Sequence, residues 1–314
     1  MYKIITYRRW YYGFSALVIL PGLIAMIYSM FTIGTPFRLS IDFVGGTLWE
    51  MQFEQAVQPG EIVEVFKDNG VSDASASTIG DEYTFIVRSS EISPEQKQAI
   101  EADLTAAFGL PEELQFRAVG PIIGKEVTRT AFIATILATV VILGFITWAF
   151  RQVANPFRFG ATAVLAMLHD VLITLGFFSI MGIVAGWELD ALFLTALLTV
   201  IGFSVQDTIV VFDRIRENSR RHRGEDFEVI ANRSLLETMQ RSIATQINAM
   251  FVMIALILFG GVTIRHFIAT MLVGMLSGTY SSIFIATPLL VSWYKKEFPW
   301  LGRSEKKRHK AATA

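Results

Sequence analysis

The sequence IGFSVQDTIVVFDRIREN at residues 201–218 passes from an apolar stretch into a charged one without a break. The preceding residues are also apolar, so residues 190–212 are long enough to cross a bilayer core of about 30 Å as a helix. An aspartate, Asp207, lies inside this stretch and is followed by Thr208. A charge near the bilayer centre costs roughly 2.5–3.5 kcal/mol, so it needs a partner, water or a function. The stretch therefore predicts a membrane helix that carries a carboxyl group.

The composition of the whole chain fits an integral membrane protein. Of its 314 residues, 53% are apolar or aromatic and 18% are charged, and the mean hydropathy is +0.48, which is too apolar for an ordinary soluble domain. The absence of cysteine excludes disulfides, cysteine zinc sites, iron–sulfur clusters and thiol catalysis. Four histidines without a His-Glu-x-x-His run argue against a metallohydrolase. A formal net charge of −1 provides no field for binding nucleic acid.

The apolar stretches predict a polytopic α-helical membrane protein with six transmembrane helices. We expect these helices at about residues 11–31, 129–150, 160–182, 190–212, 239–260 and 267–292. Lys and Arg gather before the first helix, after the second, after the fourth and after the sixth, which places both termini in the cytoplasm. The expected parts are residues 1–37 (cytoplasmic N-terminus and first helix), 38–122 (outer domain), 123–294 (helices two to six, with a cytoplasmic loop at 213–236) and 295–314 (basic cytoplasmic tail). The basic run at 306–310 fits either a topology anchor near acidic lipids or a docking patch for an anionic partner.

The long segment between the first two helices predicts an extracytoplasmic ferredoxin-like α+β domain. Its pattern predicts, in order, a strand at 47–54, a helix at 59–69, strands at 74–78 and 83–88, a helix at 94–108 and a strand at 114–119. Ser93 and Gln96 form a capping box around Pro94 at the start of the second of these helices. No catalytic constellation is present, and both binding of an extended chain at a sheet edge and docking against a partner domain fit such a fold.

Two polar stripes predict a seam between the fourth and fifth membrane helices. The stripes are Ser204, Asp207 and Thr208 on the fourth helix and Arg241, Thr245 and Asn248 on the fifth. Because the fourth helix runs toward the cytoplasm and the fifth away from it, Asp207 and Arg241 lie at similar depth. We therefore expect an Asp207–Arg241 pair across the seam. It fits either a static ion pair that sets helix register or a switch in which protonation of Asp207 releases Arg241.

The third and sixth helices carry further polar or small residues. His169 and Asp170 are neighbours in the third helix, and we expect their side chains to point in different directions; a place on a proton path and a buried packing role both fit. Gly274, Gly278 and Ser282 form a row that favours close helix approach, within the chain or to another subunit. An aspartyl protease using Asp170 and Asp207 is disfavoured, because the two differ in depth by about 6 Å.

Several of these segments resemble the SecF family of protein-export membrane subunits, which are relatives of the RND exporters. The strongest is residues 201–218, and IDFVGG at 41–46, VGP at 119–121, LHD at 168–170 and TMQRS at 238–242 add to it. One departure is Gln206, where asparagine is usual in the family. The resemblance implies that Asp207 and Arg241 are proton-linked groups, together with an aspartate supplied by SecD.

The resemblance also implies function and partners. It implies a non-enzymatic accessory of the Sec translocon in the bacterial cytoplasmic membrane, with protons as the coupling ion and no other cofactor. The implied partners are SecD, the SecYEG channel, exported polypeptide and membrane lipid, with YajC and YidC as further candidates and SecA as an indirect one. Six helices are half of an RND-type bundle, so SecD would supply the rest. Residues 42–47 and the glycine row are candidate contacts with it, although Gly45 and Gly46 also fit a simple turn. The alternative is an RND-type exporter subunit for small molecules or lipids.

Overall fold

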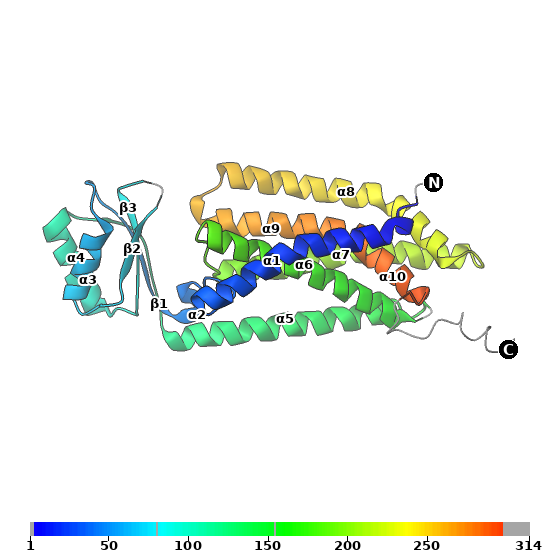
Figure 1. Ribbon diagram of the computed structural model, residues 1–314, viewed down its shortest axis with the longest axis horizontal. Coiled ribbons are helices and arrows are strands. Elements are labelled where there is room, and N and C mark those ends of the chain that lie inside the picture. Colours follow the sequence, from blue (N-terminus) through cyan, green and yellow to red (C-terminus); the bar gives the residue numbers. More distant parts are fainter. Residues whose placement is uncertain (1–2, 80, 154, 298–314) are drawn as a thin grey trace. The chain divides into compact units, whose positions relative to one another are not determined.

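The structure, a computed structural model, describes residues 3–79, 81–153 and 155–297 and divides the chain into two compact units (Figure 1). The helical unit consists of Met1–Arg38, Ala134–Trp187 and Leu192–Ala314, and the α+β unit of Leu39–Ile133 and Glu188–Ala191. The basic run predicted at 306–310, and most of the tail that contains it, lie outside the described residues.

Six helices among the described residues are long and apolar enough to cross a membrane, as the hydropathy pattern predicts. They are α1 (Arg8–Ile33, preceded by η1 at Ile5–Tyr7), α5 (Pro121–Ala149), α6 (Pro156–Val184), α7 (Ala191–Arg221), α8 (Phe227–Phe259) and a composite of α9 (Val262–Ser281), η2 (Ser282–Ala286) and α10 (Thr287–Tyr294). Each helix extends beyond its predicted span at one end or at both, because helical hydrogen bonding continues into the polar flanks that a hydropathy criterion excludes.

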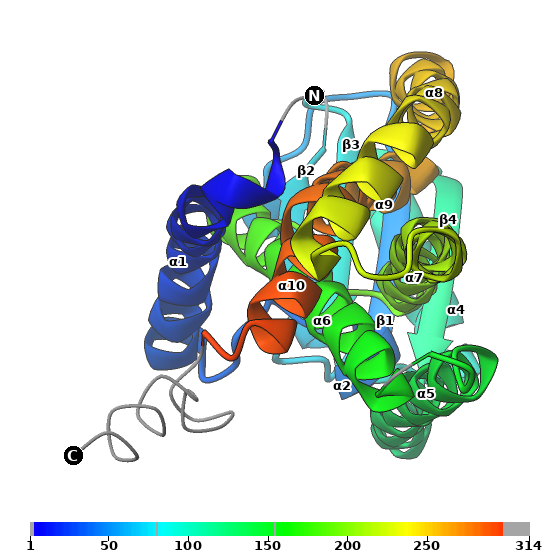
Figure 2. The same cartoon turned by 90° about the vertical axis from the view of Figure 1, so that its right-hand side faces the viewer.

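The helices of the helical unit differ in how much of their apolar surface is buried. About half of the apolar window is buried in α6, α7 and the composite sixth span, but only 17% in α1 and α8 and 6% in α5. Helix α6 packs against α1, α9 and α10, and Figure 2 views these helices along the bundle. The exposed apolar faces of α1, α5 and α8 are therefore the surfaces that face lipid or a partner protein.

The sixth span contains a π-helical turn, η2, with a local cause. Pro288 follows it and has no N–H to donate, and its ring would clash with the backbone four residues earlier in an α-helix. Widening the turn relieves this conflict. The Thr287 hydroxyl donates to the Ser282 carbonyl oxygen (3.4 Å), which supplies a hydrogen bond within the widened turn.

Ion pairs join the helix ends at the basic side of the bundle. The Arg8 guanidinium on α1 donates to Glu297 after α10 (2.9 Å) and pairs with Glu228 on α8 (3.2 Å). The hydrogen bond from Arg8 is the main cause that lowers the pKa of Glu297 below its ordinary value. Lys295 adds a contact to Asp226 at the start of α8 (3.5 Å).

The α+β unit contains the expected βαββαβ order of elements. Its elements are α2 (Ile41–Val44), β1 (Gly46–Gln52), α3 (Pro59–Asp68), β2 (Ser75–Thr78), β3 (Thr84–Ser89), α4 (Pro94–Phe108) and β4 (Glu112–Val119). The strands are antiparallel in the order β2-β3-β1-β4, which is the split arrangement of a ferredoxin-like sheet. The short helix α2 is absent from the sequence prediction, since four residues carry too little periodicity to detect.

The hydrophobic core of this unit lies between the sheet and helices α3 and α4. Trp49, Met51 and Phe85 project from the strands, and Phe66 and Leu104 meet them from the helices. The capping box of α4 is present: the Gln96 N–H donates to the Ser93 hydroxyl (3.2 Å), and the Ser93 N–H donates to the Gln96 side chain (3.0 Å).

The Gly45-Gly46 pair is needed within the α+β unit itself. Both residues have positive φ (+81° and +119°), and a Cβ atom would lie 2.7 Å from Pro121 Cα or 2.6 Å from the Ser89 carbonyl oxygen. Asp42 holds the same segment, since its carboxylate accepts from the Arg117 guanidinium and from the Ala191 N–H (3.0 Å). These contacts support the turn interpretation of the pair, and its contact with another subunit stays a prediction.

Helices α1 and α6 cross at a pair of glycines. A Cβ atom on Gly22 would lie 2.5 Å from Gly176 Cα, whereas one on Gly13, also on α1, would meet nothing within 4 Å. The crossing therefore requires glycine at position 22 and not at position 13.

Replacing Gly22 by alanine should destabilise the protein by about 1–3 kcal/mol, because overpacking at a tight contact forces the backbones apart. Thermal unfolding in detergent measures this, with Gly13→Ala as the matched control that leaves the midpoint unchanged or raises it. Equal midpoints for the two variants would contradict the close crossing.

Candidate functional site

Asp170 on α6 is the acceptor of a buried hydrogen-bond cluster. Its side chain is fully buried. Its carboxylate accepts hydrogen bonds from the hydroxyl groups of Ser204 on α7 and of Ser277 and Ser281 on α9, each with an oxygen–oxygen distance of 2.6 Å. Three hydroxyl donors replace the water that a carboxylate would lose on entering the bilayer. The cluster thus links three membrane helices through one carboxyl group.

His169 extends this cluster to a fourth helix. Its Nδ1 lies 3.0 Å from Asp170 Oδ1, and its Nε2 lies 3.0 Å from the Ser15 hydroxyl on α1. The prediction that the His169 and Asp170 side chains point apart was wrong. The His169 imidazole contacts Asp170 with one ring nitrogen and Ser15 with the other.

Asp207 on α7 has a different partner from the predicted one. Its side chain is almost completely buried, and Oδ2 accepts a hydrogen bond from the amide Nε2 of Gln246 on α8 (2.6 Å). Among the described residues, no ion pair joins Asp207 to Arg241, whose side chain is exposed. In this structure Arg241 lines a depression of about 320 Å³ together with Asp213, Arg214 and Glu217.

The predicted stripe on α8 was assigned to the wrong face. Thr245 and Asn248 are exposed with Arg241, while Thr238, Ser242 and Gln246 lie on the buried face. The prediction placed the charge of Arg241 toward the neighbouring helix. The face of a helix that packs against its neighbours is instead the face whose polar groups find hydrogen-bond partners there. The spacing of four residues from Thr238 to Ser242 to Gln246 is the signal that could have identified this face.

The predicted stripe on α7 divides between two sites. Ser204 donates to Asp170, Asp207 accepts from Gln246, and the Thr208 hydroxyl donates to the Ser204 backbone oxygen (3.1 Å). The single seam that the sequence predicted is therefore two separate carboxyl sites. They share no hydrogen-bond partner in the described part of the chain.

Two members of the small-residue row bring α9 against α7 within this chain. A Cβ atom on Gly274 would lie 2.2 Å from Val200, and one on Gly278 would lie 3.4 Å from Ser204 Cα and 3.7 Å from Asp170 Oδ2. Gly278 therefore gives the serines of α9 access to Asp170. Ser282 is buried at the start of η2 and donates to the Thr279 carbonyl oxygen (3.1 Å).

Comparison with known proteins identifies the family. The model of the family described as protein export membrane protein SecD/SecF, C-terminal, matches residues 99–296, and that of the SecD/SecF GG motif matches residues 31–57. The protein translocase subunit SecF of Thermobaculum terrenum is 47% identical over 310 residues, covering 95% of this chain and 96% of the relative. The SecF subunit of Anaerolinea thermophila is 46% identical, covering 98% of this chain and 99% of the relative.

Solved structures agree with this assignment. The crystal structure of SecDF, a translocon-associated membrane protein from Thermus thermophilus, matches with a TM-score of 0.76 at 30% identity over 93% of this chain. SecDF in a super-membrane-facing form matches with a TM-score of 0.65 at 29% identity over the whole chain. This chain spans only 38% and 40% of the length of those two chains. The chain belongs to the SecD/SecF family, as a SecF subunit of the protein translocase and a multi-pass protein of the bacterial inner membrane.

Proposed function

We propose that this SecF subunit couples proton movement to protein export and that Asp207 is the group that gains and loses the proton. The observation that carries the proposal is the pairing of Asp207, 7% exposed inside a membrane-spanning helix, with the neutral amide of Gln246. A permanent structural carboxylate at such a site would be expected to have a cation beside it. An amide partner instead fits a carboxyl group that changes its charge.

The chemistry of the partners supports a site that tolerates both charge states. The Gln246 amide can donate its N–H to an ionised carboxylate or offer its oxygen to a protonated one. The serine hydroxyls around Asp170 have the same freedom, since each can donate or accept. Asp170 with His169 is therefore the second proton-holding group of the proposal, and it links α1, α6, α7 and α9.

Arg241 enters the proposal as the partner of ionised Asp207. A guanidinium stabilises a carboxylate more strongly than an amide does. Arg241 and Gln246 are five residues apart, or about 140° around α8, so exchanging one for the other requires α8 to turn or slide against α7. In the observed arrangement Gln246 donates to Asp207 and Arg241 is exposed, so Asp207 is not paired with Arg241 in this state. Each proton that crosses 100 mV would supply about 2.3 kcal/mol to such a cycle.

SecD is the proposed partner, because the matched SecDF chains contain more than twice the length of this chain. The sparsely buried faces of α1, α5 and α8 offer surface for six further helices. We place both termini in the cytoplasm and the α+β unit outside, in line with the distribution of Lys and Arg. The SecYEG channel, YajC, YidC and the exported polypeptide belong to the same proposal.

Replacing Asp207 by asparagine should abolish the gradient-dependent part of export and leave export driven by the motor ATPase unchanged. Asparagine imitates the neutral acid and keeps an acceptor for Gln246, so the variant should fold and assemble. The measurement is protein translocation into membrane vesicles with and without a proton gradient. Asp68→Asn, an exposed change at the end of α3 in the α+β unit, is the control, and full gradient stimulation in Asp207→Asn would contradict the proposal.

Arg241→Met should cause the same loss, because ionised Asp207 would then have no cation to bind. If the two residues act as a pair, the double variant should be no worse than either single one. The same vesicle assay measures this, and independent, multiplying losses would show that Arg241 acts elsewhere.

Affinity purification of the tagged chain from its own membranes should recover SecD in equal amounts. The exporter alternative requires no such partner. Recovery of the chain as a homo-oligomer that still exports a small molecule or lipid would favour that alternative.

A further inference from the structure

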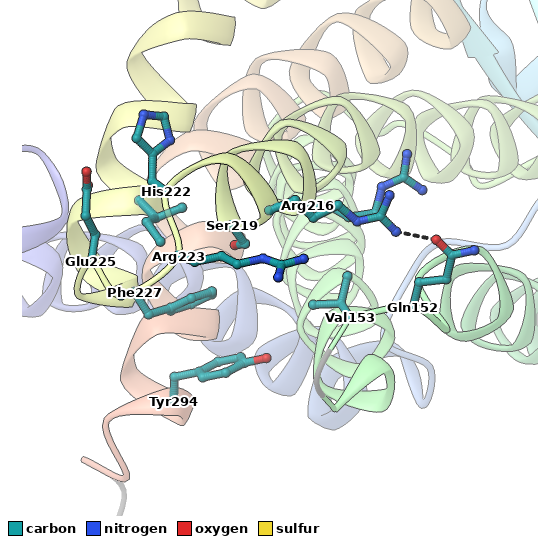
Figure 3. A pocket seen from close by; sticks show the side chains of 12 residues that line it. Gln152, Val153, Arg216, Ser219, His222, Arg223, Glu225, Phe227 and Tyr294 are labelled. Carbon is teal, nitrogen blue, oxygen red and sulfur yellow. Dashed lines mark hydrogen bonds between the residues drawn. The ribbon is translucent and has the colours of Figure 1, made fainter.

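A basic pocket of about 330 Å³ lies in the helical unit at the end where α7 passes into α8 (Figure 3). It is formed by the connection between α5 and α6, the last turns of α7, the start of α8 and the end of α10. The lining residues that matter here are Gln152, Arg216, Ser219, Arg220, Arg223 and Tyr294. Neither proposed proton site contributes to it.

The charges around the pocket leave a positive excess. Its one acidic lining residue, Glu225, is paired with Arg233 (2.9 Å), which is outside the lining. Arg216 is paired with Asp213 (2.6 Å), while Arg220 donates to the neutral amide oxygen of Gln152.

Two lining groups have no assigned partner among the described residues. For Arg223, no ion pair or hydrogen bond is formed in that part of the chain. The Ser219 hydroxyl oxygen is buried there without a hydrogen-bond partner, which is a costly position for a polar atom. In Figure 3 the Arg223 side chain extends from the α7–α8 connection toward Val153. The pocket thus combines a cation and a hydroxyl donor that a bound anion would satisfy.

Aromatic residues at this end of the bundle indicate the depth of the pocket. Trp148 and Phe157 are exposed on either side of the α5–α6 connection, and Trp293 meets Phe157 edge-on at 6.5 Å next to the lining residue Tyr294. Tryptophan and tyrosine collect where the hydrocarbon of a bilayer meets the headgroups. The pocket therefore lies at the level of lipid phosphates.

We propose that this pocket binds the phosphate group of an anionic phospholipid. The guanidinium group of arginine presents paired N–H donors to phosphate oxygens. Basic pockets between membrane helices are suited to anionic headgroups. Arg223 and Arg220 hold the phosphate, and the Ser219 hydroxyl donates to one of its oxygens. Because the walls come from four separate segments, the bound headgroup ties the α5–α6 connection to α7, α8 and α10. The inference is independent of proton coupling.

The test is lipid binding to the purified full chain in detergent, measured by native mass spectrometry with phosphatidylglycerol and phosphatidylcholine. The wild-type chain should prefer phosphatidylglycerol, and Arg223→Gln should weaken its binding about fivefold, as expected for one basic residue near a headgroup. Arg221→Gln is the matched control, because it removes the same charge two residues earlier in the chain. The Arg221 side chain is 63% exposed and is paired with Glu217 outside the pocket. Arg223→Lys should restore part of the affinity.

Several outcomes would overturn the inference. Equal weakening by Arg221→Gln and Arg223→Gln would show an unspecific attraction to a basic surface. The absence of any preference for phosphatidylglycerol would exclude the anionic headgroup. A second experiment uses millimolar inorganic phosphate with the lipid-free chain. If this phosphate binds with the same dependence on Arg223 and phosphatidylglycerol is not retained, the ligand is soluble phosphate and the lipid assignment fails. Arg220→Gln repeats the comparison at a second lining residue in case Arg223→Gln does not fold.

Discussion

A carboxyl group inside a bilayer has no water to solvate it, and the helical unit is organised around two such groups. Asp170 accepts hydrogen bonds from hydroxyl groups on α7 and α9 and is linked to α1 through His169 and Ser15. Asp207 joins α7 to α8 through Gln246. Since an unsatisfied polar group in hydrocarbon costs several kcal/mol, these bonds constrain which faces of the helices can meet.

Close approach of the helices makes this arrangement possible. Hydroxyl oxygens reach a carboxylate at 2.6 Å only if the backbones that carry them lie near one another. Gly278 provides that access for α9, and Gly22 with Gly176 does so for α1 and α6. The small residues and the polar residues of the bundle therefore serve one purpose, although they appear as separate features along the chain. Small residues at helix contacts also suit a bilayer, where packing rather than a hydrophobic force drives association.

The proposed proton cycle requires that the partners of the two carboxyl groups accommodate both charge states. Both sites use groups whose hydrogen bonds can reverse, and Arg241 on the exposed side of α8 is available as a stronger partner for an ionised carboxylate. The basic end of the bundle is built differently. There the arginines of α7 are held by carboxylates, by the amide oxygen of Gln152 and by the ring of Phe150.

Hydropathy and periodicity determined the six membrane helices, the order of elements in the α+β unit, the α4 capping box and the placement of Asp170 and Asp207 within membrane spans, because each of these depends on a short stretch of chain. The resemblance of residues 201–218 was sufficient to indicate the family. The partners Ser15, Ser277, Ser281 and Gln246 were missed, and the polar face of α8 was assigned to Arg241 instead. Only the tertiary structure decided these points. A sequence pattern shows which residues share a face of one helix, but the rotation of that helix against its neighbours depends on packing and hydrogen bonds contributed by residues far away in the chain.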